Sequence, residues 1–233
     1  ALALRQRTLA NRVVMTPTSS ALGRNRLPSE ANAAFYEARA AGGVGMIVSE
    51  GLRVHATNCA PTHIGTFLPE VAAGLKRIEA RVHAHGTTLI GQIMHGGRQS
   101  HQHVPHLLWA PSAVACPYSG YMPHAMITAE VEAMRDHFVL GAIRVQEAGW
   151  DGIELHAGQG HLVQQFLSPL SNVRTDRYGG DFERRLTFAL EVLDRIRARC
   201  GALFIIGFRL ASSEFVPGGL DVDDAIAIAR AVE

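Results

Sequence analysis

The sequence has few cysteines, and they form no recognisable motif. Cys59, Cys116 and Cys200 lie far apart, and no CxxC pair occurs. A disulfide framework needs an even set of cysteines, and an iron–sulfur site needs closely spaced ones. We therefore expect free thiols in a reduced, cytoplasmic setting.

An excess of charge and long apolar runs are also missing. The 22 Lys and Arg residues are balanced by 21 Asp and Glu residues, so the net charge is +1. Such a balance gives no attraction to nucleic acid or to an anionic membrane surface. No apolar run approaches the roughly 20 residues of a membrane helix, and the N-terminus lacks the pattern of a signal peptide. Because the chain begins with Ala1, an earlier targeting segment would still be compatible with it.

Apolar residues are plentiful, and they occur in short runs separated by helical stretches. They make up 47% of the 233 residues, which predicts one domain with a large core. Runs with strand character occupy residues 12–17, 44–51, 88–95, 152–158 and 204–211. Apolar residues at helical spacing follow each run, with Ser29, Thr128 and Asp221 as the expected N-caps of three helices.

This alternation of strands and helices predicts a parallel sheet, either a closed barrel or a doubly wound sheet. A doubly wound nucleotide-binding sheet favours GxGxxG after its first strand, whereas residues 18–23 read TSSALG. The position of polar residues favours the barrel, because its catalytic face lies at the C-terminal ends of the strands. Five polar residues occur at or near such ends: Thr16, Glu50, Gln92, His156 and Arg209. We predict an α/β fold, a TIM (β/α)8 barrel that is incomplete, with about five βα units in residues 1–233.

The fourth strand carries the most informative residues. Alternation places Ile153 and Leu155 on one face of the strand and Glu154 and His156 on the other. If the leucine face packs against the helices, a carboxylate and an imidazole point into the barrel, where Val, Ile or Leu is usual. A buried Glu–His pair without a catalytic role is the alternative interpretation.

Several segments together resemble the Old Yellow Enzyme family of NADH:flavin oxidoreductases, which includes 2,4-dienoyl-CoA reductases and trimethylamine dehydrogenase. The segments are NRVVMTP at 11–17, QIMHGGR at 92–98, GWDGIELH at 149–156, QFLSP at 165–169, NVRTD at 172–176, YGG at 178–180 and FRL at 208–210. They occur in the family's order over nearly the whole chain, so the match is far more specific than a single motif.

The resemblance implies that residues 1–233 are an FMN-binding barrel domain without roughly its last three βα units. It places Thr16, Pro17, Thr18 and Ser19 along the flavin, and Gly51 at a small position beside the isoalloxazine ring. Gln92 offers an amide that complements the imide edge of the pyrimidine ring. Arg209 falls where the family places a cation near N1 and O2 of the flavin. For Gln92 and Arg209, the alternative is a structural role, either in a salt bridge of the barrel or as polar residues that fill its interior.

The resemblance also implies three catalytic residues. His156 and Gln159 match the family's pair of hydrogen-bond donors, usually His with Asn or His with His, which polarise a substrate carbonyl. His161 stands where the family commonly has a tyrosine that protonates the substrate. An imidazole can fill that role at neutral pH, although His161 could also simply pack while water supplies the proton.

Two other groups of polar residues have different interpretations. His101, His103 and His106 form H-x-H-x-x-H beside His95, which makes a zinc or iron site conceivable, but we predict no metal site. A second group resembles a loop and helix that ion pairs and a glycine turn hold in place in the family. We assign a structural role to this group: Arg174, Asp176, Tyr178, Arg184 and Arg185.

The predicted activity is hydride transfer from NADH or NADPH, through FMN, to an activated alkene such as an enone or enoyl thioester. A flavin-dependent amine dehydrogenase or demethylase of the same superfamily is one alternative, and a flavin-free metal-dependent (β/α)8 lyase or hydrolase is another. We expect a small-molecule substrate and no nucleic-acid or membrane partner; a homo-oligomer stays open. An iron–sulfur (4Fe–4S) centre and FAD would be relevant only if a further C-terminal region exists.

Overall fold

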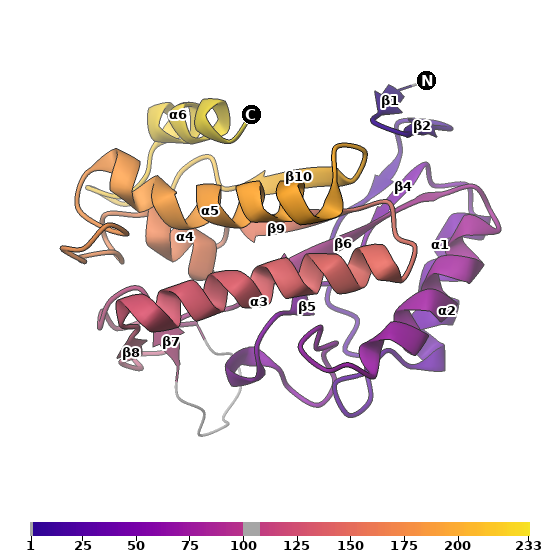
Figure 1. Cartoon of the computed structure of the whole chain (residues 1–233), viewed down its shortest axis with the longest axis horizontal. Helices are drawn as coiled ribbons and strands as arrows, with labels where there is room; N and C mark the ends of the chain where they lie inside the picture. The colour runs from indigo at the N-terminus through magenta and orange to yellow at the C-terminus, as the bar shows by residue number, and fades with distance from the viewer. Residues whose placement is uncertain (1, 100–107) are drawn as a thin grey trace.

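The computed structural model describes residues 2–99 and 108–233, and a parallel sheet is its central feature (Figure 1). The strand order is β10–β9–β6–β4–β3, with β5 (Leu52–Arg53) also pairing with β6. These strands are β3 (Val14–Met15), β4 (Met46–Val48), β6 (Thr88–Met94), β9 (Gly152–Ala157) and β10 (Ile205–Leu210). Each of the five predicted strands is present, and their order in the sheet follows their order in the chain. That order is the one a (β/α)8 barrel requires, so the barrel prediction is confirmed for its first five units.

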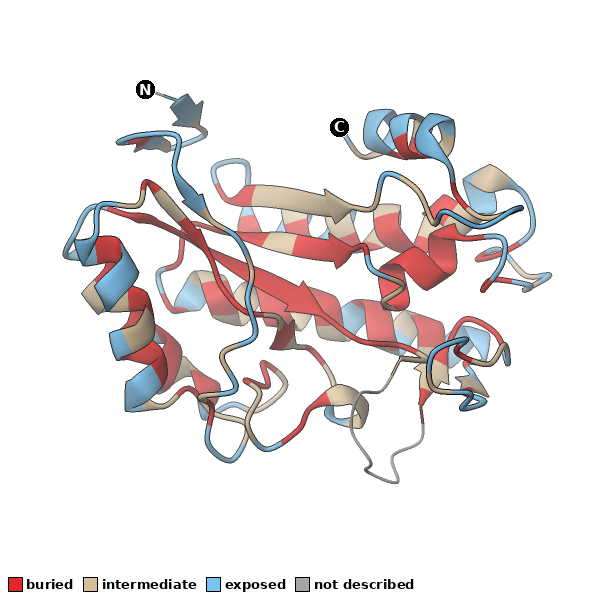
Figure 2. Ribbon diagram, turned by 180° about the vertical axis from the view of Figure 1, so that it is seen from behind, coloured by how far each residue is buried: buried red, intermediate tan, exposed pale blue. Residues whose placement is uncertain are grey.

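Helices follow the strands as predicted and pack on one side of the sheet. They are α1 (Glu30–Ala41), α2 (Val71–His83), α3 (Thr128–Glu147), α5 (Phe182–Cys200) and α6 (Val222–Val232). In Figure 1, α3 and α5 run side by side in front of the sheet, whereas the view from behind in Figure 2 shows β6, β9 and β10 in front of them. Apolar residues of α1, α2, α3 and α5 form one continuous core with this side of the sheet.

The register of β9 confirms which residues face away from the helices. Ile153 and Leu155 are fully buried in the core beneath the helices, so alternation turns Glu154 and His156 to the opposite face. On that opposite face lies a second, smaller apolar cluster, formed by Val48, Ile90 and Ile205. Leu4 and Met46 pack against it. The strand pairing aligns Gln92 with Glu154 and Arg209 with His156, which brings these polar residues together.

Two of the three predicted helix caps are confirmed, and one is wrong. Ser29 and Asp221 accept hydrogen bonds from backbone N–H groups of α1 and α6, respectively. Thr128 does not cap α3, because that helix begins at Thr128 and has Ile127 as its N-cap. The Glu130 carboxylate accepts the Ile127 N–H at 2.9 Å, while the Thr128 hydroxyl donates to Asp176 at 2.9 Å. The threonine therefore serves a tertiary contact instead of the cap.

Several short elements were not predicted from the sequence. They are the hairpin β1 (Leu2–Leu4) and β2 (Arg7–Leu9), the 3₁₀ turn η1 (Ala56–Asn58), the pair β7 (Trp109–Ala110) and β8 (His124–Ala125), the strand β5 and the helix α4 (Leu162–Leu167). Two or three residues are too few to show a period. All six residues of α4 are buried, so it has no polar face from which a helix could be recognised.

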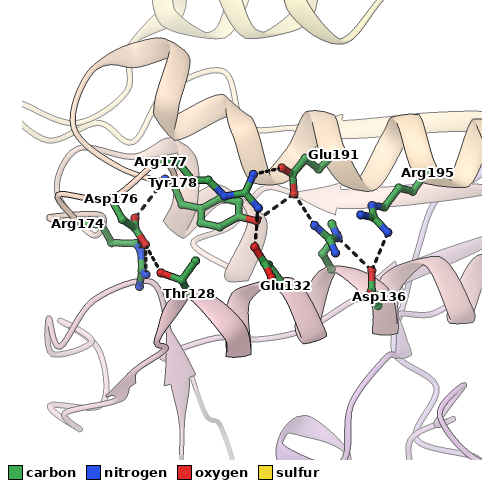
Figure 3. Close-up of polar contacts among 10 residues, drawn as sticks. Thr128, Glu132, Asp136, Arg174, Asp176, Arg177, Tyr178, Glu191 and Arg195 are labelled. Carbon is green, nitrogen blue, oxygen red and sulfur yellow. Dashed lines mark hydrogen bonds and ion pairs between the residues drawn. The ribbon is translucent and has the colours of Figure 1, made fainter.

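Three of the residues that were assigned to structure, Arg174, Asp176 and Tyr178, lie in a polar network between α3 and α5, whereas Arg184 pairs with Asp181 and Arg185 donates to the carbonyls of Leu167 and Gly180. Figure 3 shows Glu191 of α5 receiving hydrogen bonds from Arg177 at 2.6 Å and from the Tyr178 hydroxyl at 3.0 Å. Arg174 pairs with Asp176 at 2.5 Å, and Asp176 in turn accepts from Thr128 of α3. These contacts lie between the helices, which agrees with the structural assignment.

Among residues 2–99 and 108–233, we find no helix that is both long and apolar enough to cross a membrane.

Candidate active site

A cavity of about 530 Å³ is formed where the C-terminal ends of the strands meet their loops. It gathers every residue that the sequence pointed to as catalytic or cofactor-binding: Thr16, Pro17, Thr18, Ser19, Gly51, Gln92, His156, Gln159, His161 and Arg209. These residues come from segments spread over nearly two hundred positions of the chain. The barrel arrangement explains why they converge, because parallel strands present all their C-terminal ends at one edge.

Glu154 fixes the orientation of two of these residues. Its carboxylate accepts a hydrogen bond from Gln92 Nε2 at 2.8 Å, and it forms an ion pair with Arg209, whose Nε and Nη2 donate at 2.7 and 3.1 Å. The barrel salt bridge considered as an alternative therefore exists. It does not remove either residue from the cavity, because both Gln92 and Arg209 still line it. The ion pair thus holds the amide and the guanidinium in place at the cavity wall.

His156 and His161 are in direct contact. Nε2 of His156 lies 2.7 Å from Nδ1 of His161, which is a hydrogen bond whose donor depends on the tautomers. Burial lowers the pKa of His156 to about 4, with the charges of Arg209 and Arg53 acting in the same direction. His156 is therefore neutral near pH 7, and one of the two rings donates its N–H to the other.

Gln159 lies in a strained turn after β9. Its φ of 58° is in the left-handed region, and Gly160 follows with a φ of 70°. Three other glutamines hold this turn. Gln99 donates to the Gln159 carbonyl at 2.9 Å, Gln164 accepts the Gly160 N–H at 2.7 Å, and Gln165 donates to the Gly160 carbonyl at 2.6 Å. Left-handed backbone costs a residue with a Cβ about 1–2 kcal/mol, so these contacts keep the Gln159 side chain exposed at the cavity in spite of the strain.

Gly51 packs closely against Met94, so a larger residue at this position would force the flexible Met94 side chain to move. A Cβ at this position would lie 2.2 Å from Sδ of Met94, which packs directly against the glycine.

The residues that precede α1 contrast with this close packing. Thr16, Thr18 and Ser19 are exposed, and the Thr18 hydroxyl makes only a long contact of 3.4 Å to the Thr16 carbonyl. Their polar groups are consequently available to a ligand.

Glu50 ends the second strand but turns away from the cavity. Its carboxylate accepts hydrogen bonds from Ser20 at 2.5 Å and from Asn32 at 3.0 Å, and its N–H donates to the Tyr36 hydroxyl. Burial raises the pKa of Glu50 above its ordinary value. This carboxyl group ties α1 to the end of β4, so only four of the five polar strand ends meet in the cavity.

One wall of the cavity was missed from the sequence. It is formed by β5 and the loop after it: Arg53, Thr57, Asn58, Cys59, Ala60 and His63. Because this loop has no regular period, periodicity gave no reason to place it beside the strand ends. The only sequence signal was its position directly after Gly51.

The histidines of the third loop divide into two groups. His101, His103 and His106 lie outside the described residues. His95 is fully buried beside Thr57, whose hydroxyl is 2.9 Å from Nε2, and its Nδ1 accepts the Gly97 N–H at 3.0 Å. These contacts agree with a structural role for His95. Within the described ranges, no three His, Cys, Asp or Glu residues are grouped so that they could hold a metal ion.

Comparison with known proteins gives a consistent result. The family model described as the NADH:flavin oxidoreductase / NADH oxidase family matches residues 2–233. An NADH oxidase of Thermoanaerobacter brockii is 36% identical over 97% of this chain and 35% of its own length. A "multifunctional alkene reductase/demethylase OYE" of Caballeronia cordobensis is 35% identical over 99% of this chain and 34% of its own length. A solved structure of a 2-naphthoyl-CoA reductase in complex with 2-naphthoyl-CoA is 28% identical, with a TM-score of 0.95 over all of this chain and 38% of that one. The chain thus spans about a third of the length of these relatives.

Proposed function

Because the chain belongs to the NADH:flavin oxidoreductase / NADH oxidase family, to which the Old Yellow Enzymes belong, we propose that this protein is an FMN-dependent oxidoreductase. It transfers a hydride from NADH or NADPH, through the flavin, to an activated alkene. The observation that carries the proposal is the convergence of all the predicted cofactor and catalytic residues in one cavity.

The residues of the cavity fit the isoalloxazine ring of FMN. Gln92 supplies an amide and Arg209 supplies a cation, and Glu154 holds both. The exposed hydroxyl and backbone groups of Thr16, Thr18 and Ser19 would bind polar atoms along the ring. Gly51 keeps the neighbouring wall free of a further side chain. A fixed guanidinium at this place stabilises negative charge without reorganisation.

When bound, FMN supplies two-electron chemistry by taking a hydride from the nicotinamide and delivering it to the substrate. Gln159 and the His156–His161 pair would orient the substrate within the cavity. The Gln159 amide donates a hydrogen bond to a carbonyl oxygen of the substrate, and the Nε2–H of His156, which also faces Nδ1 of His161, donates a second one. These donors polarise the conjugated double bond, and each contributes in the way of an oxyanion-hole donor.

His161 is placed to manage the proton that the reduced alkene requires. Its Nδ1 is engaged with Nε2 of His156, which fixes the orientation of the ring. Its Nε2 would hold the proton that passes to the α-carbon of the substrate. Because His156 is neutral near pH 7, the pair can take up one proton after turnover without placing two positive charges in contact.

Charge in the cavity favours alkene reduction over oxidation of an amine. Two arginines line the cavity, and the described lining residues include no Asp or Glu. A protonated amine would find no counter-charge there, so the amine dehydrogenase or demethylase alternative has less support. The family assignment likewise favours flavin chemistry over a flavin-free lyase or hydrolase.

We also propose that residues 1–233 form the first five βα units of the FMN-binding barrel domain. The described sheet has two open edges, at β3 and at β10. The relatives named above are matched over only 34–38% of their lengths, which is compatible with a barrel completed by further strands.

The test of the proposed activity is an anaerobic pair of half-reactions on the flavin-loaded protein. NADH or NADPH should bleach the oxidised flavin spectrum, and a neutral enone such as 2-cyclohexen-1-one should restore it. A purified protein without flavin absorbance, or a reduced flavin that enones leave unchanged, would contradict the proposal.

A further inference from the structure

Arg53 is a cation of the cavity that the proposed chemistry does not use. Its backbone is fixed on both sides, since its N–H donates to the Ile64 carbonyl at 2.7 Å and its carbonyl accepts from the Thr66 N–H at 2.8 Å. It also pairs in register with Met94 of β6. The guanidinium therefore extends into the cavity wall from a rigid strand, not from a free loop.

Arg53 is partly buried, and its guanidinium forms no ion pair with a carboxylate of the described residues. Nη1 donates to Asn58 Oδ1 at 3.1 Å and contacts Met94 Sδ at 2.9 Å. Nε is buried without a partner among the described residues. Arg135 and Arg174 pair with the carboxylates of Glu191 and Asp176, whereas Arg26, Arg144 and Arg185 donate to backbone carbonyls instead. Arg53 differs from all of these because its Nε is buried without an acceptor among the described residues. A partly buried charge without a paired counter-charge is costly, so this guanidinium is available to an anionic ligand in the cavity.

The surroundings of Arg53 also favour an anion. Glu50 is the carboxylate that acts on its charge, but Ser20 and Asn32 hold Oε1 of Glu50 outside the cavity, and among the described residues Glu50 makes no ion pair with Arg53. Burial, with the Arg53 charge acting in the same direction, lowers the pKa of His63 to about 4. His63 is therefore neutral near pH 7. It adds a polar ring to this wall without a charge that would compete for an anion.

We propose that Arg53 binds a carboxylate of the substrate, so that the preferred substrates are unsaturated keto acids. The ketone oxygen is held by Gln159 and the histidine pair, and the carboxylate is held by Arg53 on the wall formed by β5 and its following loop. A guanidinium suits this role because its planar N–H groups match the two oxygens of a carboxylate. This inference rests on the proposed function, since it names the substrate class of the same cavity.

The experiment measures binding without turnover. Isothermal titration calorimetry on the flavin-loaded, full-length protein compares 4-oxo-4-phenylbutanoate with 4-oxo-4-phenylbutanamide, which differ in charge but not in shape and carry no alkene. Charge-assisted hydrogen bonds should make the acid bind ~10- to 100-fold more tightly than the amide. Arg53→Met should abolish this preference and leave the amide's dissociation constant unchanged, while Arg53→Lys should retain part of it.

Arg24→Met is the matched control, because Arg24 is exposed and, among the described residues, its side chain donates to the neighbouring Gly23 carbonyl and to no carboxylate. It removes the same charge from the protein and should leave the preference for the acid intact. Equal affinity of the parent protein for acid and amide would overturn the inference, and that comparison requires no variant to fold. If Arg53→Met weakened the acid and the amide by the same factor, so that the preference for the acid persisted, the inference would be overturned as well.

The same samples separate this inference from the proposed function. Flavin absorbance and its bleaching by NADPH are recorded before each titration. Turnover of neutral enones without any preference for the acid would overturn the carboxylate site alone. A protein that prefers the acid through Arg53 but holds no flavin would support the anion site and overturn the proposed function.

Discussion

At the scale of single residues, the ion pair between Arg209 and Glu154 decides how much positive charge the cavity presents. The two side chains meet at 2.7 Å, and the Arg209 side chain keeps 35% of its surface exposed while that of Glu154 keeps 13%. The carboxylate therefore fixes the guanidinium and also offsets part of its charge. Replacing each partner should act on a bound flavin with opposite sign.

Arg209→Ala in the full-length, flavin-loaded protein should lower the two-electron reduction potential, because the reduced flavin loses a nearby cation. The loss of a hydrogen bond to a charged group is commonly worth about 1–3 kcal/mol, which corresponds to roughly 20–65 mV for two electrons. Glu154→Gln should raise the potential, since it removes the offsetting negative charge. Spectroelectrochemical titration measures both. An unchanged potential in an Arg209→Ala protein that retains FMN would refute the assignment of Arg209.

The left-handed backbone at Gln159 gives a second prediction at this scale. Gln159→Gly should raise the free energy of unfolding by about 0.5–1 kcal/mol, since glycine adopts a φ of 58° without the Cβ penalty. Gly160→Ala should lower it, because the new Cβ would stand 2.3 Å from Nε2 of Gln99 in addition to the positive φ. Urea unfolding measures both. A destabilised Gln159→Gly protein would mean that the side chain contributes more than the strain costs.

At the scale of elements, the sequence predicted the strands and helices with a periodic apolar pattern. It did not predict the features that depend on contacts between distant parts of the chain. The strands are apolar runs with turns at both ends, and the helices carry an apolar stripe, so local pattern was sufficient for both. The cap of α3 was predicted wrongly because Thr128 has a tertiary partner, Asp176, 48 positions away. The cavity wall formed by β5 and its following loop, which includes Arg53, was missed for a related reason: its position is fixed by pairing between β5 and β6. The family resemblance predicted ten site residues. It did not predict that Glu154 joins two of them, Gln92 and Arg209, because that contact is visible only in the structure.

The network between α3 and α5 provides a prediction at this scale. Glu191 accepts from Arg135, Arg177 and Tyr178, and the Arg135 side chain is only 7% exposed. Glu191→Ala leaves that guanidinium with Asp136 as its remaining partner and should cost about 2–4 kcal/mol of unfolding free energy. Arg195→Ala is the control, because Arg195 and its partner Asp136 are both about half exposed and 3.4 Å apart; its effect should stay within about 0.5 kcal/mol. Thermal and urea unfolding give both values, and equal losses would show that the network adds nothing beyond surface pairing.

At the scale of the whole molecule, the two faces of the sheet differ in how well they are covered. The helix side carries a continuous apolar core, whereas the opposite side has a small cluster of three buried residues. Ile206, Phe208 and Leu210 on the edge strand β10 are only partly buried, and Val13 and Val14 are exposed at the other edge. Open strands with apolar neighbours are prone to pair with other chains. In an eight-stranded barrel, further strands would cover both edges and the inner face.

The last prediction concerns FMN binding by a chain of residues 1–233 alone. In barrels of this class, the phosphate is commonly bound by the loops after strands seven and eight and by the N-terminus of a short helix. The described residues supply strands that correspond to the first five, and we propose that the cavity binds the ring of the flavin, whereas its phosphate would need the later loops. We therefore expect the isolated chain to bind FMN with a dissociation constant weaker than about 1 µM, because the phosphate bears most of the charge of FMN and would remain in solvent. Fluorescence titration with FMN and, as the control, with riboflavin measures this directly. The two ligands should bind with similar weak affinity, since they differ only in the phosphate. Sub-micromolar binding of FMN by a soluble monomer, with much weaker binding of riboflavin, would reveal a phosphate site within residues 1–233.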